Sequence, residues 1–124
     1  MRALIAVSCL SLLICKPAQS SPYTIMGEGV ASCATFGQDY KRAPAFAEDN
    51  YFGWAQGYMS GLNALSHAAG GKQHVLNAKT TDEQRRFIRD WCNKHPLADY
   101  YKAVLALIYS LPTLDEADEP IQEK

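Results

Sequence analysis

The sequence has no excess of charge of either sign. Its 124 residues include 12 Lys and Arg against 13 Asp and Glu, which gives a formal net charge of −1. Domains that bind nucleic acids ordinarily carry a basic excess that pairs with phosphates. We therefore expect no nucleic acid among the partners of this protein.

Motifs that hold cofactors or metals are also missing. The sequence has no phosphate-binding loop, no glycine fingerprint for a dinucleotide and no Gly-x-Ser-x-Gly elbow around a nucleophilic serine. Its histidines, at positions 67, 74 and 95, do not form a His-x-x-x-His metal pair. We expect no cofactor, no metal and no catalytic residue, and hence a protein that is not an enzyme. A small secreted hydrolase with a dispersed catalytic set stays open as an alternative.

Long apolar runs are limited to one, close to the N-terminus. Residues 3–15 form a 13-residue apolar run that follows Arg2 and precedes the small-residue pair Ala18-x-Ser20. These are the three parts of a secretory signal, and the run is too short to span a bilayer, which takes about 20 apolar residues. We predict a cleaved signal peptide over residues 1–20, no membrane span, and a periplasmic or secreted mature protein. A lipoprotein anchored through Cys15 is the minor alternative, because Ile14 is bulky where a lipobox takes a small residue.

Cysteine is scarce once the signal is removed. Of four cysteines in the chain, only Cys33 and Cys92 lie outside the predicted signal peptide. An even pair in an oxidising compartment indicates a disulfide, and the absence of a Cys-x-x-Cys motif argues against redox catalysis. We predict one long-range disulfide with a structural role.

Helical spacing and capping residues divide the mature chain into three or four helices. Ser32 is a candidate cap for a first helix that ends before Pro44, and a second helix is expected from Ala47 to about Ala69, ended by glycines 70 and 71. Thr80 and Glu83 have the spacing of a capping box at the start of a third helix, which Pro96 closes. The sequence predicts a small all-α bundle cross-linked by the disulfide.

The remaining segments complete the predicted organisation. Residues 21–30 should form an irregular lead-in, and Pro96 is expected to open a fourth helix that runs to Pro112. Residues 113–124 contain five acidic residues and no aromatic residue, which predicts a disordered acidic tail. A single helical domain is thus expected over residues 21–112.

Acidic residues 48, 49, 82 and 83 are explained by the preference of carboxylates for the first turn of a helix.

Aromatic and leucine side chains at helical spacing supply the predicted core. Two adjacent tyrosines, Tyr100 and Tyr101, point about 100° apart on a helix, so one of them should reach the surface. We assign Tyr100 to the surface and Tyr101 to the core. The predicted core residues are Phe36, Trp54, Leu62, Phe87, Trp91, Tyr101 and Leu105.

Three glycines recur every four residues within the second helix, at Gly53, Gly57 and Gly61. Each glycine in a helix costs roughly 0.5–1 kcal/mol relative to alanine, so the set requires a compensating role. The favoured interpretation is a close crossing with another helix of the same chain, in which case Gly57→Leu should cost about 1–3 kcal/mol through overpacking. The alternative is a docking face, formed with Tyr58 and Tyr100, for a partner protein or a second copy.

Three short segments of the sequence resemble known small exported proteins of Gram-negative bacteria. The segments are residues 32–36 (Ser-Cys-Ala-Thr-Phe), 54–61 (Trp-Ala-Gln-Gly-Tyr-Met-Ser-Gly) and 91–96 (Trp-Cys-Asn-Lys-His-Pro). They are similar to HdeA-type acid-stress chaperones and to the Rap/Tai immunity proteins, which neutralise cell-wall-cleaving effectors. The resemblance implies an HdeA-like helical fold and an exported, non-enzymatic protein that binds another protein in the periplasm. An acid-activated holdase chaperone is the alternative that the same resemblance implies, and a homodimer is left open.

Overall fold

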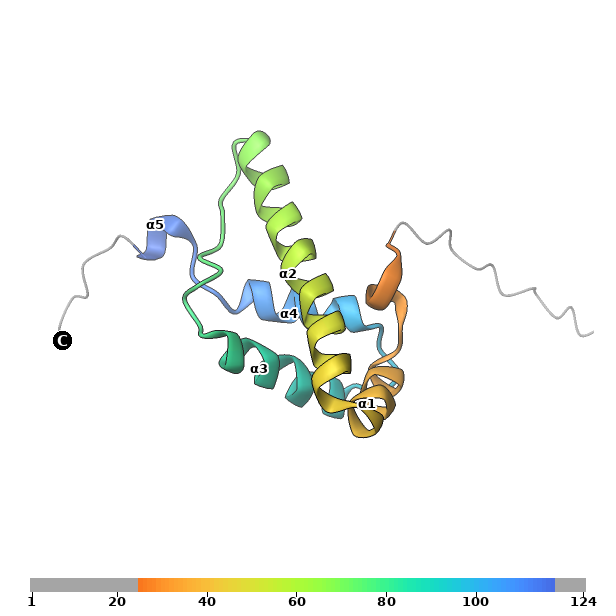
Figure 1. Cartoon of the computed structure of the whole chain (residues 1–124). Coiled ribbons are helices and arrows are strands. Elements are labelled where there is room, and N and C mark those ends of the chain that lie inside the picture. Colours follow the sequence, from red (N-terminus) through yellow and green to blue (C-terminus); the bar gives the residue numbers. More distant parts are fainter. Residues whose placement is uncertain (1–24, 118–124) are drawn as a thin grey trace, which may run out of the picture.

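A computed structural model describes residues 25–117, and within this range the fold is all-α without a strand (Figure 1). The predicted signal peptide, its cleavage site and the last seven residues lie outside the described residues. The elements in chain order are the 3-10 helix η1 (Gly27–Val30) and the helices α1 (Cys33–Arg42), α2 (Pro44–Ala68), α3 (Thr81–Lys94), α4 (Tyr100–Tyr109) and α5 (Leu114–Ala117). The prediction of a small helical bundle is therefore confirmed.

Helix α2 is the longest element, with 25 residues. Figure 1 shows it crossing in front of α4, with its C-terminal end extending beyond the other helices. None of the helices in residues 25–117 combines the length and the apolar character that a membrane crossing requires.

Local capping explains where α1, α2 and α3 begin or end. The Ser32 hydroxyl accepts a hydrogen bond from the Thr35 N–H at 3.0 Å and caps α1, as predicted. Thr80 and Glu83 form the predicted capping box at the start of α3. After α2, Gly70 adopts a φ of 71°, a left-handed conformation that glycine tolerates and that ends the helix.

Two helix starts differ from the sequence prediction. Helix α2 begins at Pro44, three residues earlier than expected, because proline fits the first turn of a helix without losing a hydrogen bond. Helix α4 begins at Tyr100, with Asp99 as its N-cap residue, and not at Pro96. The Pro96 and Ala98 carbonyls instead accept hydrogen bonds from the first N–H groups of α1, and Leu97 is left 94% exposed.

Both ends of the described chain are more regular than predicted. The expected irregular lead-in contains η1, which packs on α2 and α4. Residues 113–117, which were expected to belong to a disordered tail, are part of the fold. Thr113 pairs with His74 in an isolated bridge, and the Leu114 N–H donates to the Gln73 carbonyl at 3.0 Å, so backbone pairing with the connection after α2 orders this segment.

The predicted disulfide between α1 and α3 is present. Cys33 and Cys92 join α1 to α3, with Cα atoms 4.8 Å apart, and both are buried. The link closes a long stretch of chain, because the two cysteines are 59 residues apart. Closing a loop of that length with a disulfide stabilises the folded protein by roughly 4 kcal/mol, because the cross-link lowers the conformational entropy of the unfolded chain.

The prediction for the two adjacent tyrosines is wrong. Tyr100 is 1% exposed, whereas Tyr101 is only half-buried. The ring of Tyr100 lies 5.1 Å from that of Phe36 and 4.9 Å from that of Tyr51, between centroids. Tyr100 lies on the same face of α4 as the buried residues Val104, Leu107 and Ile108, at i+4, i+7 and i+8, so its ring enters the core between α1 and α2.

The other predicted core residues lie where the core meets the surface. Phe36 is fully buried, whereas the remaining five are partly buried and pack against the core cluster, namely Trp54, Leu62, Phe87, Trp91 and Leu105. Smaller side chains of α2 and α4, which the prediction did not include, form the fully buried centre. They include Ala55, Met59, Ala103, Val104, Leu107 and Ile108.

Candidate functional site

Helix α2 has a buried face and an open face. Tyr51, Phe52, Ala55 and Met59 are buried against the other helices. The three glycines lie on the opposite side, because residues on a helix are separated by about 100° and Gly57 is therefore about 160° away from both Ala55 and Met59. The sequence spacing alone could not show which of the two faces the glycines would occupy.

Within residues 25–117, no other helix crosses α2 at these glycines. Apart from the adjacent backbone of α2 itself, no described atom lies within 4 Å of a Cβ atom built at Gly53, Gly57 or Gly61. The favoured sequence interpretation is therefore wrong, since η1 and α4 pack against other sides of α2. The destabilisation expected for Gly57→Leu also loses its basis, because a leucine there meets open space.

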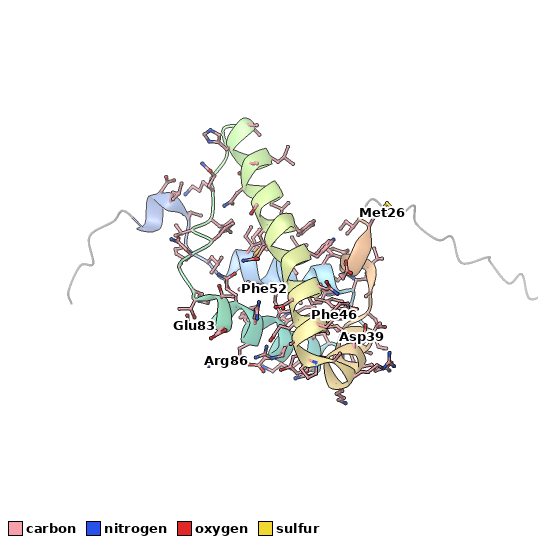
Figure 2. The ribbon with its side chains drawn as sticks, in the orientation of Figure 1. Met26, Asp39, Phe46, Phe52, Glu83 and Arg86 are labelled. Carbon is pink, nitrogen blue, oxygen red and sulfur yellow. A yellow bond between two sulfur atoms is a disulfide. The ribbon has the colours of Figure 1, made fainter. Side chains whose placement is uncertain are left out.

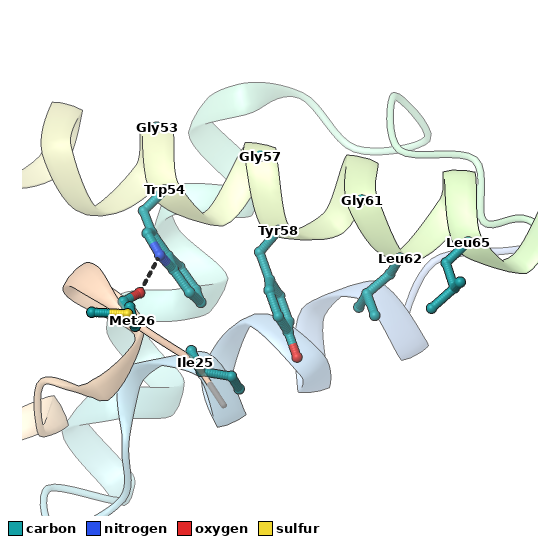
Figure 3. Close-up of a pocket in the computed structure, with 9 residues that line it drawn as sticks. All are labelled: Ile25, Met26, Gly53, Trp54, Gly57, Tyr58, Gly61, Leu62 and Leu65. Atoms are coloured by element: carbon teal, nitrogen blue, oxygen red, sulfur yellow. Dashed lines mark hydrogen bonds between the residues drawn. The ribbon is translucent and has the colours of Figure 1, made fainter. Parts of the chain in front are cut away.

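An apolar groove runs along α2 beside these glycines. Its volume is about 540 Å³, and its side-chain walls come from α2 and from the two residues that precede η1 (Figure 3). Figure 3 shows the α2 side chains projecting from the same side of the helix, with residues 25 and 26 across from Trp54 and Tyr58. We call this site the groove; it is lined by the three glycines with Ile25, Met26, Trp54, Tyr58, Leu62 and Leu65.

Trp54 fixes the end of the groove nearest to η1. Its indole Nε1 donates a hydrogen bond to the Met26 carbonyl at 2.9 Å, and its ring stacks on Tyr58 with centroids 4.9 Å apart. The same ring lies so close to Gly29 that a Cβ there would come within 2.2 Å of it. Burial raises the pKa of the Tyr58 hydroxyl above the ordinary 10.0.

Two groove residues expose large apolar side chains. Met26 is 82% exposed and Leu65 is 68% exposed. Single exposed apolar residues are common, but these two belong to one concave site, which is typical of an interaction surface. Of the predicted docking-face residues, the structure brings the glycines and Tyr58 together; Tyr100 is buried and does not belong to the surface.

The stretch of sequence that contains the α2 residues of the groove has no charged residue. No Asp, Glu, Lys or Arg occurs from Asn50 to Gly71, although 20% of all residues are charged. Exposed helix faces are ordinarily charged, and interface cores are depleted of charge. This uncharged stretch is a sequence signal for the groove that spacing and motif searches do not detect.

A cluster of charges lies at the other end of α2. Glu48 pairs with Arg89, and with Arg85 at 3.9 Å, while Arg85 also donates to Asp49 at 3.1 Å. The side chains of Glu48, Arg85 and Arg89 are 18–28% exposed. Because α2 begins at Pro44, Glu48 and Asp49 lie beyond its first turn, and they serve to join α2 to α3 instead of capping a helix.

Within residues 25–117, no three His, Cys, Asp or Glu side chains come together in a way that could hold a metal ion. His95 is the C-cap residue of α3, and its Nδ1 lies 2.8 Å from the Trp91 carbonyl. His74 Nδ1 lies 3.0 Å from the Leu111 carbonyl in the connection that follows α4. These two histidines therefore support helix ends and connections.

Comparisons with protein families, with characterised proteins and with solved structures give no match for this chain. The groove and the charged cluster lie on the same helix. Both are built on α2, with the groove beside its open face and the cluster near its start.

Proposed function

We propose that this protein is an exported, non-enzymatic binding protein that receives an apolar helical segment of another periplasmic protein in the groove. The observation that carries the proposal is an uncharged concave surface with exposed Met26 and Leu65, beside glycines whose Cβ positions have no described atom outside α2 within 4 Å. A partner that covers such a surface removes apolar area from water, which contributes a binding free energy of about 25 cal/mol for each Å² buried.

The dimensions of the groove favour a helix as the bound element. Trp54 and Leu65 are eleven residues apart on α2, which corresponds to about 17 Å along the axis. A partner helix of about eleven residues has the same length. Glycines without Cβ atoms let its backbone approach α2 closely, whereas larger residues would hold it away.

A protein segment fits the groove better than a small metabolite does. Small-molecule sites ordinarily enclose about 70–90% of the ligand and add a few convergent polar groups for orientation. This groove is open on one side, and its Trp54 N–H is already bonded to the Met26 carbonyl. An elongated apolar partner is the ligand class that such a surface can cover.

The test is capture of the partner by matched variants. Immobilised wild-type protein, Leu65→Asp and Leu97→Asp are exposed to periplasmic extract, and a captured protein is identified and titrated against each variant by calorimetry. Leu97 is 94% exposed and lies outside the groove, so Leu97→Asp controls for loss of surface apolarity. We expect Leu65→Asp alone to weaken binding at least tenfold. Equal binding by all three proteins would contradict the proposal.

The charged cluster favours a second candidate function, that of an acid-activated holdase. Protonation of Glu48 in acid would leave the half-buried Arg89 without a carboxylate partner and Arg85 with the exposed Asp49 alone. An uncompensated charge in that position favours separation of α2 from α3 and exposure of apolar surface. A client-aggregation assay at about pH 2.5 and at pH 7 tests this: protection restricted to acid would support the holdase, and no protection at either pH would contradict it.

A further inference from the structure

The hydroxyl of Tyr58 is a polar group of the groove that the fold leaves without a partner. The Trp54 N–H and the Met26 carbonyl also belong to groove residues, but these two groups are bonded to each other at 2.9 Å. Within residues 25–117, the Tyr58 hydroxyl makes no hydrogen bond. The side chain is half-buried and lines the groove, and Figure 3 shows its hydroxyl pointing away from α2. A segment that lies in the groove can therefore reach this oxygen.

The direction of the hydroxyl is fixed by the residues around it. The Tyr58 ring stacks on the Trp54 ring at an interplanar angle of 14°, with centroids 4.9 Å apart. Trp54 is in turn held by its hydrogen bond to Met26. Burial raises the pKa of Tyr58, and the neighbouring Tyr101 and Tyr109 add to the increase. A group that is already held in one orientation loses little conformational entropy when it binds a partner.

A helix that covers the groove removes water from this hydroxyl. A buried hydroxyl that loses water without gaining another partner weakens binding by roughly tenfold to a hundredfold. We propose that Tyr58 is a specificity-determining residue of the groove, and that the bound helix carries one uncharged hydrogen-bonding side chain opposite its hydroxyl. This inference rests on the proposed function, because it concerns the helix that the groove receives.

The chemistry of the groove restricts which group of the partner can bond to Tyr58. Backbone groups within a helix are paired with each other, so the bonding group has to be a side chain. A charged side chain would lose water without meeting an opposite charge, because the groove is lined by no Asp, Glu, Lys or Arg. Figure 2 shows the charged Glu83 and Arg86 on α3, well away from Met26. A tyrosine hydroxyl both donates and accepts, so serine, threonine, asparagine and glutamine all suit it.

The position of Tyr58 along α2 predicts where this side chain lies on the partner. Tyr58 is four residues from Trp54 and seven from Leu65. These separations correspond to about 6 Å and about 10 Å along the helix axis. On a partner helix of about eleven residues, the polar residue should therefore lie about a third of the way from the end nearest to Trp54. A uniformly apolar helix of the same length should bind at least tenfold less tightly, because it leaves the hydroxyl unpaired.

Peptide selection tests the inference without a known partner. The probe is a phage-displayed library of helix-forming peptides, about 13 residues long, in which one helix face is randomised. The library is selected on immobilised wild-type protein and counter-selected on Leu65→Asp, the groove variant introduced above. We expect the selected peptides to share one serine, threonine, asparagine or glutamine at a fixed position within an otherwise apolar face.

Calorimetry on the selected peptides then measures the contribution of the hydroxyl. Each peptide is compared with a copy in which the polar residue is replaced by an apolar residue of similar size. The replacement should weaken binding to wild type at least tenfold and change binding to Tyr58→Phe by less than twofold, because the hydroxyl is absent from that variant. Tyr101→Phe removes a neighbouring hydroxyl that does not line the groove, so it should behave as wild type.

The possible failures are distinguishable. Apolar peptides that bind wild type as tightly as the polar ones, or a Tyr58→Phe variant that still discriminates between them, would overturn the role of Tyr58 and leave the groove as the binding site. If no peptide prefers wild type to Leu65→Asp, the proposed function itself is contradicted, and the inference about Tyr58 is overturned with it.

Discussion

The indole N–H of Trp54 donates to the Met26 carbonyl across 28 residues of sequence, at a distance of 2.9 Å. The same indole ring covers the backbone of η1 at Gly29, where no Cβ would fit. One side chain therefore holds the segment before α1 against α2 and also forms a wall of the groove. The groove is consequently only as rigid as the attachment of η1.

Trp54→Phe should lower the free energy of unfolding by about 1–2 kcal/mol, because it removes one hydrogen bond and part of the buried ring. Urea denaturation measures the change. Hydrogen exchange should accelerate at the amides of η1 more than at those of α3, since the attachment of η1 is what is lost. Equal protection of η1 in both proteins would contradict the role assigned to Trp54.

Gly29→Ala should cost about 1–3 kcal/mol, because its methyl group overlaps the Trp54 ring. In the double variant with Trp54→Phe, the smaller ring leaves room for that methyl group. Gly29→Ala should then cost less in the Trp54→Phe variant than in wild type, and a double-mutant cycle measures the difference between the two costs. Strict additivity would show that the two residues do not contact each other as described.

Gly57→Ala should stabilise the protein by about 0.5–1 kcal/mol, because alanine is the better helix former and its methyl group meets no other atom. Gly37→Ala, on α1, is the matched control, since it too has open space at its Cβ. Urea unfolding at low micromolar concentration compares both with wild type. A loss of stability in Gly57→Ala alone would mean that another part of the chain packs on this face.

The parts of the fold that could be predicted from the sequence depend on short-range chemistry. The Ser32 cap and the Thr80–Glu83 capping box are local hydrogen-bonding patterns. The Cys33–Cys92 disulfide followed from counting cysteines outside the predicted signal. Each of these features is determined by residue type over a few positions, or by elimination, and needs no knowledge of how helices pack.

The features that could not be predicted depend on rotation about a helix axis. Tyr100 and Tyr101 exchange roles because the buried stripe of α4 runs through Tyr100, Val104, Leu107 and Ile108, whereas the prediction followed the neighbouring stripe of Tyr101 and Leu105. No local signal at Pro96 shows that its carbonyl accepts a hydrogen bond from the first turn of α1. The glycines of α2 have a spacing that suits a crossing and an open face equally well. The charge-free stretch from Asn50 to Gly71 could have separated these two interpretations, since an exposed face without charge indicates an interaction surface.

Glu48→Gln should lower the free energy of unfolding at pH 7 by about 1–3 kcal/mol, because the half-buried Arg85 and Arg89 lose a charged acceptor. Asp49→Asn is the control: Asp49 is 70% exposed, and exposed ion pairs contribute about 0–1 kcal/mol. A cost for Glu48→Gln that is no larger than the cost for Asp49→Asn would contradict the role assigned to the charge of Glu48.

Stability should also fall at alkaline pH, through Tyr51. Its hydroxyl donates to Asp39 Oδ2 at 3.1 Å. Burial raises the pKa of Tyr51 from 10.0 to about 12, and the hydrogen bond with Asp39 and the negative charges of Asp39 and Glu28 add to the increase. Burial raises the pKa of the neighbouring Tyr100 as well.

The sign of this effect follows from proton binding. Between pH 10 and about 12 the folded protein keeps the Tyr51 proton while the unfolded chain loses it, so each step upward in pH favours unfolding. The stabilising contribution is complete below pH 10 and is lost as pH rises through about 12. Urea midpoints measured from pH 9 to pH 12 should therefore decline for wild type and decline less for Tyr51→Phe. Tyr101→Phe, a change outside the buried aromatic cluster, should follow wild type; a slope for Tyr51→Phe equal to that of wild type would contradict the assignment to Tyr51.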